Sequence, residues 1–254
     1  MPKPVVRRAT CLGGNECMID YFIRVAPATI VICTFLFLLP KKFTELRIAS
    51  YIMMFVIFRD AMTPMGFWEI NSKHVFRFHG TPLQLVILGI GSTLMAFTIN
   101  HFEPGLKKLV VYFKGEKSVG LAIGLACALL IATPVVVYSY ISKSEHEALS
   151  GVMIFAILIL AMMGNFLEEI LFRGYLQGYL ENSVGAKHAA VLSGFFFSVA
   201  HASLATIITS FPIAILGFTL YEGLIAAFVR RKYGVVPATI AHGGAIFLIA
   251  SGIL

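Results

Sequence analysis

The sequence predicts an all-α fold, a polytopic bundle of about eight transmembrane helices. Of the 254 residues, 58% are hydrophobic and only 13% are charged, whereas a soluble domain carries about 25% charged residues. The mean hydropathy of the chain is +0.86. The charged residues occur in short patches between apolar runs, and these runs have the length of about 20 residues that crosses a bilayer.

The apolar runs follow one another along the whole chain with short connections between them. The predicted spans are 22–40, 51–70, 82–100, 118–141, 150–172, 187–203, 205–229 and 235–254. The spans 51–70 and 187–203 are less apolar than the others. Because no internal repeat or low-complexity linker divides the chain, we expect one integral membrane domain over residues 1–254, with residues 1–21 as an N-terminal tail.

The net charge of +7 does not indicate a nucleic-acid partner. Most Lys and Arg residues lie in the connections between spans, as membrane topology and contact with anionic lipid require. The expected partner is therefore the lipid bilayer, and the expected location is the inner membrane of a prokaryotic cell. Cys11 and Cys17 have no His or second Cys pair near them, which argues against a metal site. A disulfide between them would require an oxidising compartment.

Ionisable side chains inside the predicted spans are the strongest functional signal. Each costs about 2.5–3.5 kcal/mol on membrane-insertion scales, so such groups usually face the interior of a bundle and mark function. For Glu222, a purely structural role inside the bundle is the alternative to a role in catalysis. Arg59 and Asp60 are adjacent, so they do not stack on one helix face, and they either pair with other helices or line a cavity. The interior candidates are Arg59, Asp60, Glu168, Glu169, Arg173, His201, Glu222 and His242.

Helix geometry separates the two adjacent acids of the segment GNFLEEILFRGYL. Glu169 and Arg173 are four residues apart, so they lie on one helix face with the acid before the base, the favourable order for an ion pair. Glu168 points about 100° away from Glu169 and has no cation near it in sequence. We therefore expect Glu169 to be a structural partner of Arg173, and Glu168 to be a general base.

Two histidines lie in later apolar spans. In SGFFFSVAHASL, Phe197 precedes His201 by four residues, so the phenyl ring can pack on the imidazole and fix its position. In VVPATIAHGGAIFL, His242 is followed by Gly243 and Gly244, which let another helix approach closely. A single membrane histidine is as often a hydrogen-bonding residue between helices as a catalytic one. A free acid and two buried histidines on three helices, however, could together activate a water molecule.

These motifs resemble those of a known family of membrane proteases. Glu168-Glu169-x-x-x-Arg173, then Phe197-x-x-x-His201, then a histidine in a later helix, is similar to the pattern of the CAAX prenyl endopeptidase and bacteriocin-processing family. The resemblance covers roughly the C-terminal half and implies a protease core at about 150–254.

The resemblance implies a helical bundle with a cavity open to the bilayer and a glutamate mechanism that uses no metal and no other cofactor. Glu168 and His201 would activate a water molecule, and His242 would hold the oxyanion. The residues implied as catalytic are Glu168, Glu169, Arg173, His201 and His242.

The sequence departs from the family in one place, because no asparagine follows the last histidine. Gly243, Gly244, Ala245 and Ile246 follow it instead, so a second donor to the oxyanion has to come from elsewhere. The N-terminal half matches no motif of the family. We expect Phe197, Arg59 and Asp60 to contact the substrate.

The resulting prediction is an intramembrane endopeptidase that cleaves a membrane-anchored protein or peptide. A prenylated C-terminal peptide, a leader peptide and a C-terminal sorting tag all remain open as substrates. One alternative is a zinc protease with Glu168, His201 and His242 as ligands and one open position, although HExxH is absent. Another is a non-catalytic immunity or scaffold protein of the same fold. A proton-coupled transporter is the third, but the two halves of the chain are not repeats.

Overall fold

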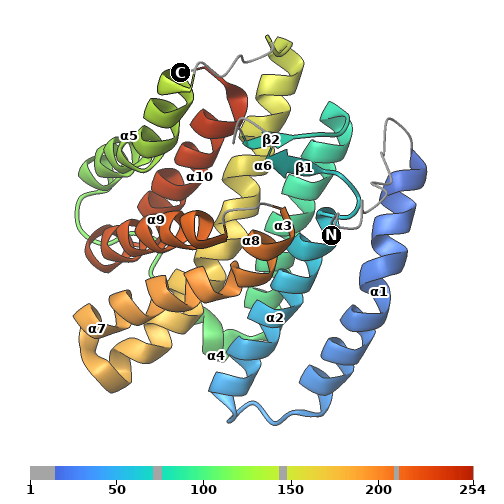
Figure 1. The fold of residues 1–254 in the computed structure, drawn as a ribbon. Helices are drawn as coiled ribbons and strands as arrows, with labels where there is room; N and C mark the ends of the chain where they lie inside the picture. Colours follow the sequence, from blue (N-terminus) through green and yellow to red (C-terminus); the bar gives the residue numbers. More distant parts are fainter. Residues whose placement is uncertain (1–14, 71–75, 143–147, 209–211, 254) are drawn as a thin grey trace.

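The computed structural model of the chain describes residues 15–70, 76–142, 148–208 and 212–253. Its long helices pack into one bundle, in which α7 and α9 cross beside the others (Figure 1). Five helical stretches of this described part are long and apolar enough to cross a membrane: Met18–Leu38, Pro82–Phe102, Lys117–Ile141, Gly151–Thr206 and Pro212–Tyr233. The stretch Gly151–Thr206 is a continuous run of several helices, which are given separately below. The predicted fold class, an all-α polytopic membrane bundle, is confirmed.

The N-terminal half contributes three long helices and a hairpin. Helix α1 begins at Asn15, within the stretch 1–21 that the sequence assigned to a tail. Residues 1–14, with Cys11, and the side chain of Cys17 lie outside the described part of the structure. The elements are α1 (Asn15–Leu38), α2 (Thr44–Met62), β1 (Trp68–Ile70), β2 (Phe76–Phe78), α3 (Pro82–Phe102) and α4 (Pro104–Lys107).

The predicted span 51–70 is wrong in its second half. Helix α2 ends at Met62, because Pro64 interrupts the helical pattern and Gly66 takes a positive φ of 74°. The chain then turns through hydrogen bonds from Gly66 to Thr63 and from Phe67 to Met62. It continues as strand β1, which pairs antiparallel with β2. The hairpin brings the rings of Trp68, Phe76 and Phe78 together.

All the secondary-structure elements described in the C-terminal half are helices. Helix α7 contains one non-helical residue, Gly185, with φ 77°, which bends the chain into two arms (Figure 1). The second arm covers most of the predicted span 187–203. The elements are α5 (Lys117–Ile141), α6 (Gly151–Glu169), the π-helical turn η1 (Ile170–Leu176), α7 (Gln177–Ala200), α8 (Ala202–Ile208), α9 (Pro212–Tyr233) and α10 (Val235–Ser251).

Glycines allow the close helix contacts that assemble the C-terminal half. A Cβ atom on Gly243 would lie 2.8 Å from the backbone oxygen of Ala161, so α10 packs directly on α6. A Cβ atom on Gly194 would lie 3.0 Å from the backbone nitrogen of Leu224, which brings α7 against α9. A Cβ atom on Gly244 would lie 2.9 Å from Ala128 of α5. The predicted close approach at Gly243 and Gly244 is therefore confirmed.

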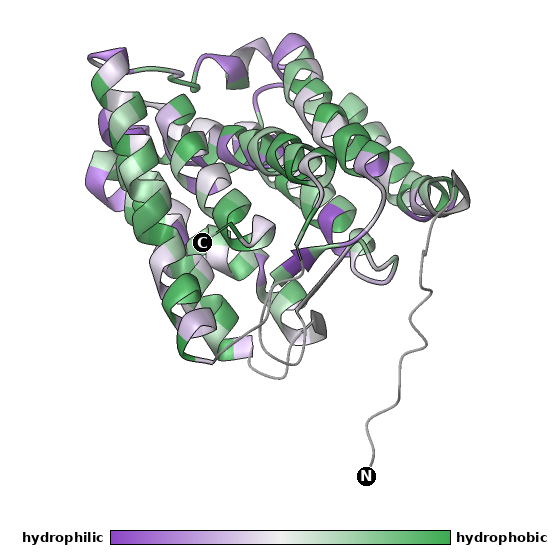
Figure 2. Cartoon of the chain, turned by 90° about the horizontal axis from the view of Figure 1, so that it is seen from above, coloured by the Kyte–Doolittle hydropathy of each residue, from purple (hydrophilic) through white to green (hydrophobic). Residues whose placement is uncertain are grey.

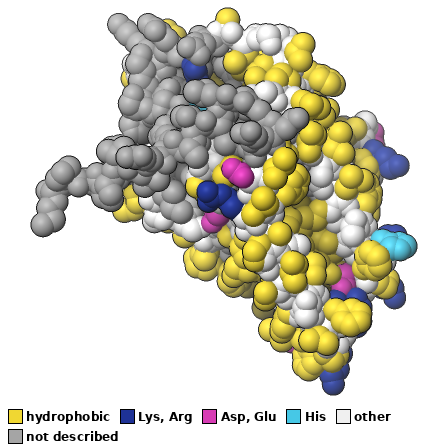
Figure 3. Space-filling model, turned by 90° about the vertical axis from the view of Figure 1, so that its right-hand side faces the viewer, with side chains coloured by type: hydrophobic (Ala, Val, Ile, Leu, Met, Phe, Trp, Pro, Cys, Tyr) yellow, Lys and Arg dark blue, Asp and Glu magenta, His cyan; other side chains and the backbone are white. Residues whose placement is uncertain are grey.

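The surface of the bundle is apolar, as contact with lipid requires. Hydrophobic positions dominate along the helices, and hydrophilic positions gather at helix ends and at a few points inside the bundle (Figure 2). Among the described residues on the side that carries α1, hydrophobic side chains predominate (Figure 3), and Ile23, Val31 and Phe37 are among those exposed on α1. A surface of this kind would be unstable in water, so the chain is an integral membrane protein.

Candidate active site

The first part of the site is the junction between α6 and the π-helical turn η1. Glu168 and Glu169 end α6, and Arg173 lies within η1. Nη1 of Arg173 is 3.2 Å from Oε1 of Glu169, which is the contact that helix spacing predicted. Nη2 of Arg173 donates to the carbonyl of Gly223, 3.1 Å away on α9. Because π-helical turns occur often at functional sites, this junction is a candidate position for catalysis.

His242 joins the same network from α10. Its Nδ1 lies 2.9 Å from Oε1 of Glu169, and its Nε2 lies 3.3 Å from Oε1 of Glu222 on α9. The ring packs edge-on against Phe197 at a centroid distance of 5.3 Å. Both ring nitrogens of His242 therefore face carboxylates, and α6, α9 and α10 are held together by one buried polar cluster.

Phe197 is the apolar centre of this arrangement. Its side chain is fully buried, and the guanidinium of Arg173 lies 4.2 Å from its ring centroid. The imidazole of His201 packs on the same ring at a centroid distance of 4.4 Å, in agreement with the predicted four-residue pairing. Phe197 is not part of the cavity wall described below, so its contacts assign it a packing role rather than the expected contact with substrate.

Glu168 and His201 face each other on the other side of this cluster. Nδ1 of His201 lies 2.8 Å from the carbonyl oxygen of Phe197, so this nitrogen carries the hydrogen and Nε2 is left as the acceptor. Nε2 lies 4.0 Å from Oε2 of Glu168. Among the residues that the structure describes, this Glu168 oxygen has no hydrogen-bond partner. A gap of this size between a carboxylate and an imidazole can be bridged by a water molecule.

Arg59 and Asp60 lie beside His201, at the C-terminal end of α2. Nη2 of Arg59 is 2.8 Å from Oδ1 of Asp60 and 2.6 Å from the carbonyl oxygen of Ala200. Ser203 donates to Oδ2 of Asp60. The two residues therefore pair with each other, although they are adjacent in sequence, and they attach α2 to the turn that carries His201.

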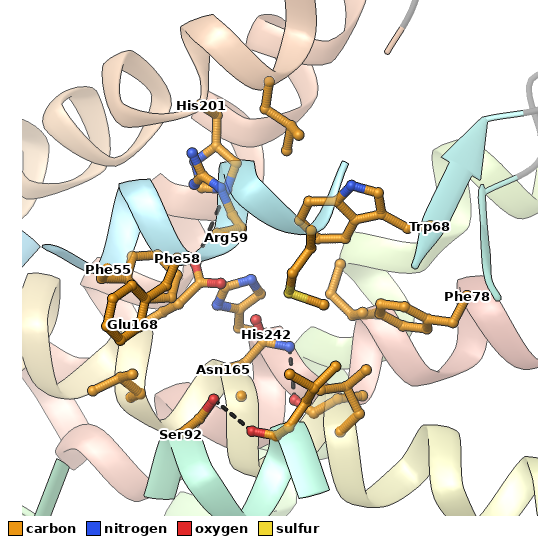
Figure 4. A pocket seen from close by; sticks show the side chains of 18 of the residues that line it. Phe55, Phe58, Arg59, Trp68, Phe78, Ser92, Asn165, Glu168, His201 and His242 are labelled. Atoms are coloured by element: carbon orange, nitrogen blue, oxygen red, sulfur yellow. Dashed lines mark hydrogen bonds and ion pairs between the residues drawn. The ribbon is translucent and has the colours of Figure 1, made fainter. Parts of the chain in front are cut away.

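A cavity of about 1120 Å³ opens beside these groups and is lined mostly by apolar side chains from both halves of the chain. The hairpin residues Trp68 and Phe78 form part of the wall, and Glu168, His201 and His242 are directed towards it (Figure 4). Glu169, Arg173 and Asp60 are not in the wall. The polar and charged side chains that line the cavity include Arg59, Asn165, Glu168, His201, Glu222 and His242.

Glu222 and Asn165 line this wall but were not among the predicted site residues. Glu222 was recognised as an interior charge, but its place beside His242 depends on how α9 packs against α10. Asn165 precedes Glu168 by three residues and shares its helix face, a signal that could have identified it. Its Nδ2 donates to the carbonyl of Ala161 at 2.7 Å.

The alternative zinc set gains no support from this arrangement. Zinc would need a free nitrogen from each of His201 and His242, and both nitrogens of His242 face carboxylates. Over the described ranges, no group of three or more His, Cys, Asp or Glu side chains is placed to hold a metal ion. The metal-free mechanism stays a prediction.

Comparison with known proteins identifies the C-terminal half. A family model described as type II CAAX prenyl endopeptidase Rce1-like matches residues 150–248. This range contains Glu168, Glu169, Arg173, His201 and His242. No curated protein and no solved structure matches the chain. Over residues 150–248, this integral membrane protein is therefore similar to the type II CAAX prenyl endopeptidase Rce1-like family.

Proposed function

We propose that the protein is an intramembrane endopeptidase in which Glu168 and His201 activate a water molecule. One observation carries the proposal. Glu168 has a carboxylate oxygen without a hydrogen-bond partner in the described structure, 4.0 Å from Nε2 of His201 and in the wall of a large apolar cavity. Glu169 differs, because Arg173 and His242 both contact it and it lies behind that wall.

In the proposed reaction Glu168 takes a proton from the water, and the water oxygen attacks the carbonyl carbon of the scissile peptide bond. The electron pair of the carbonyl double bond moves onto its oxygen, which becomes an oxyanion. When this intermediate collapses, the C–N bond breaks and the proton held by Glu168 passes to the leaving amine. The products are a carboxylic acid and an amine, and the chemistry consumes no cofactor.

His242 has a different role here from the one that the family resemblance implied. Its Nδ1 lies 2.9 Å from Glu169. Its Nε2 lies 3.3 Å from Oε1 of Glu222, an oxygen that has no hydrogen-bond partner among the described residues. Both nitrogens are therefore directed to carboxylates, although the ring lines the cavity. We assign His242 to positioning, because with Glu169, Glu222 and Arg173 it fixes the helix junction that presents Glu168.

The cavity supports a substrate that reaches the site from the membrane. Its wall exposes far more apolar than polar surface, which suits a lipid-attached or strongly apolar peptide. A membrane-anchored protein with a prenylated C-terminal peptide is the substrate class that agrees best with the family of this domain. A leader peptide or a C-terminal sorting tag would fit the same cavity, and a prokaryotic inner membrane remains the proposed location.

The test is cleavage by purified protein in liposomes. A panel would contain a prenylated C-terminal peptide, the same peptide without the prenyl group, and an apolar leader peptide. We expect wild-type protein to cleave at least one of them and Glu168→Gln to cleave it about 10²–10⁴-fold more slowly. The absence of cleavage by correctly folded wild-type protein across the panel would favour the non-catalytic scaffold, a role that the missing asparagine after His242 also suits.

A further inference from the structure

The proposed reaction places negative charge on the carbonyl oxygen of the substrate, and this charge needs a hydrogen-bond donor. Preorganised donors at this position usually make the largest single contribution to the rate of acyl transfer. The inference below rests on the proposed function and concerns which side chain supplies that donor. A suitable group has to line the cavity, lie near Glu168 and His201, and keep an N–H that is not already used.

Arg59 meets these conditions. Its side chain is 5% exposed and lines the cavity. Nε and Nη2 are held by Asp60 at 3.1 and 2.8 Å, and Nη2 also donates to the carbonyl oxygen of Ala200, the residue before His201. Nη1 is buried and has no hydrogen-bond partner among the described residues. One edge of the guanidinium is thus fixed, and the N–H groups of Nη1 remain available to donate a hydrogen bond.

The charge of Arg59 is compatible with this apolar position because Asp60 is paired with it. An unpaired guanidinium would be costly to bury, whereas the pair is nearly neutral. Ser203 holds the second oxygen of Asp60, so the pair is fixed to the segment that carries His201. A donor held in this way requires no reorganisation when charge develops on the substrate.

The other donors of the site are less suitable. Nδ1 of His242 is directed to Glu169, and its Nε2 lies 3.3 Å from Oε1 of Glu222, which forms no hydrogen bond in the described structure. The negative charge of Glu222 beside Nε2 would repel an oxyanion there. Arg173 is fully buried behind Phe197 and does not line the cavity. Asn165 does line it, but its Nδ2 already donates to Ala161 at 2.7 Å, which leaves one amide hydrogen. Figure 4 shows Arg59 on the His201 side of the cavity and Asn165 near His242.

We propose that Nη1 of Arg59 donates to the oxyanion of the tetrahedral intermediate and is a catalytic residue of this protein. The N-terminal half thereby supplies an oxyanion donor to a site whose general base, Glu168, and whose histidine, His201, lie within residues 150–248. The water oxygen attacks from the side of Glu168 and His201, the carbonyl electron pair moves onto oxygen, and Arg59 stabilises that charge without transferring a proton.

The test compares Arg59→Met, which keeps the length of the side chain but has no donor, with Arg59→Lys and wild type. We expect Arg59→Met to lower kcat/KM by about 10²–10³-fold, mainly through kcat, and Arg59→Lys to recover part of the loss. Arg24→Met removes an exposed arginine of α1 that lies outside the cavity wall and should retain wild-type turnover.

Three further measurements separate this role from a structural one. Binding of a peptide phosphonate, which imitates the tetrahedral intermediate, should weaken in Arg59→Met by about the same factor as kcat/KM, while binding of uncleaved peptide to Glu168→Gln should be unaffected by adding Arg59→Met. Arg59→Met should slow the cleavage of substrates with a free and with an amidated C-terminus by the same factor, because the proposed contact is with the carbonyl oxygen of the scissile bond and not with the terminal carboxylate.

Several outcomes would overturn the assignment. Normal turnover in Arg59→Met, or a loss confined to substrates with a free carboxylate, would remove Arg59 from the oxyanion site. A larger kcat loss in Asn165→Leu than in Arg59→Met would transfer the role to Asn165. Absence of cleavage by wild type is a distinct result, because it would reject the proposed protease function itself.

Discussion

At the scale of single residues, two adjacent glutamates have different surroundings because successive helical positions point about 100° apart. Oε1 of Glu169 contacts both Arg173 and His242. Glu168 faces the cavity and His201. The same chemical group can therefore stabilise the fold at one position and remain available for a reaction at the next.

This difference predicts opposite effects of the same substitution. Glu168→Gln should lower turnover by about 10²–10⁴-fold, because the base is lost, with little change in thermal stability. Glu169→Gln removes one partner of a buried ion pair and should reduce the free energy of unfolding by about 3–5 kcal/mol. Turnover and thermal denaturation of both variants in one detergent measure the two effects. Equal destabilisation by the two substitutions would contradict the division of roles.

Glu168 and His201 should also act as one unit. If both hold the same water molecule, His201→Ala should lower kcat about as much as Glu168→Gln, and the double variant should lose little more than either single variant. Turnover measurements on wild type and the three variants complete a double-mutant cycle. Multiplicative losses would mean that the two side chains act independently.

At the scale of secondary-structure elements, the site depends on the distance between α6 and α10. His242 reaches Glu169 because Gly243, the next residue, lets α10 approach the backbone of Ala161. The π-helical turn η1 holds Arg173 under Phe197 in the same region. A short polar contact in the site is therefore produced by a close backbone contact between helices.

Gly243→Ala should disrupt this contact. The added Cβ atom would lie 2.8 Å from the backbone oxygen of Ala161, so α10 has to move, and overpacking of this kind costs about 1–3 kcal/mol. Gly217→Ala on α9 is the matched control, since its Cβ atom meets nothing within 4 Å. We expect lower melting temperature and turnover only for Gly243→Ala. Unchanged values for both variants would show that the contact does not hold the site together.

At the scale of the whole molecule, a second polar cluster joins three helices at one end of the bundle. Arg47 of α2 contacts the carboxylate of Glu103, which follows α3, and donates to the carbonyl oxygens of Leu36 and Leu39 at the end of α1. Lys41 and Tyr51 also donate to Glu103. This cluster lies outside the cavity wall, so its role is stability.

Stability should fall at acid pH through Glu103. Burial raises the pKa of this carboxyl group, but hydrogen bonds from Arg47, Lys41 and Tyr51 outweigh burial and hold the pKa below its ordinary value. Below about pH 4.3, the usual pKa of Glu, the unfolded chain binds this proton first, so stability is lost as pH falls towards the folded pKa. Thermal denaturation of wild type and Glu103→Gln across this range should show a smaller acid dependence in the variant. Parallel curves would contradict the prediction.

The purified protein should contain no stoichiometric zinc, and its turnover should survive treatment with a chelator. The reason is that His242, a ligand that a zinc site would need, has both nitrogens directed to carboxylates. Metal analysis alongside turnover measures both quantities. About one zinc per chain, lost together with activity in His201→Ala, would reject the glutamate mechanism.

The sequence by itself determined the class of the protein and the local part of the site. Apolar runs of bilayer length allow only helices or closed barrels, and helix spacing alone fixes the Glu169–Arg173 and Phe197–His201 contacts. These predictions hold because residues four apart lie on one face of a helix, and the π-helical turn η1 still leaves Arg173 within 3.2 Å of Glu169. The helix end at Met62 was missed, although Pro64 and Gly66 were a readable signal.

Only the tertiary structure decided which distant groups meet. His242 lies between Glu222 of the preceding helix and Glu169, which is 73 residues earlier in the sequence. Arg59 lies beside His201 and donates to the carbonyl oxygen of Ala200, which is 141 residues later. The rotation and spacing of packed helices set such contacts, and no local pattern encodes them. A hydrophobic span predicts that a helix crosses the membrane. Which of its side chains contact the neighbouring helices depends on the packing of the whole bundle.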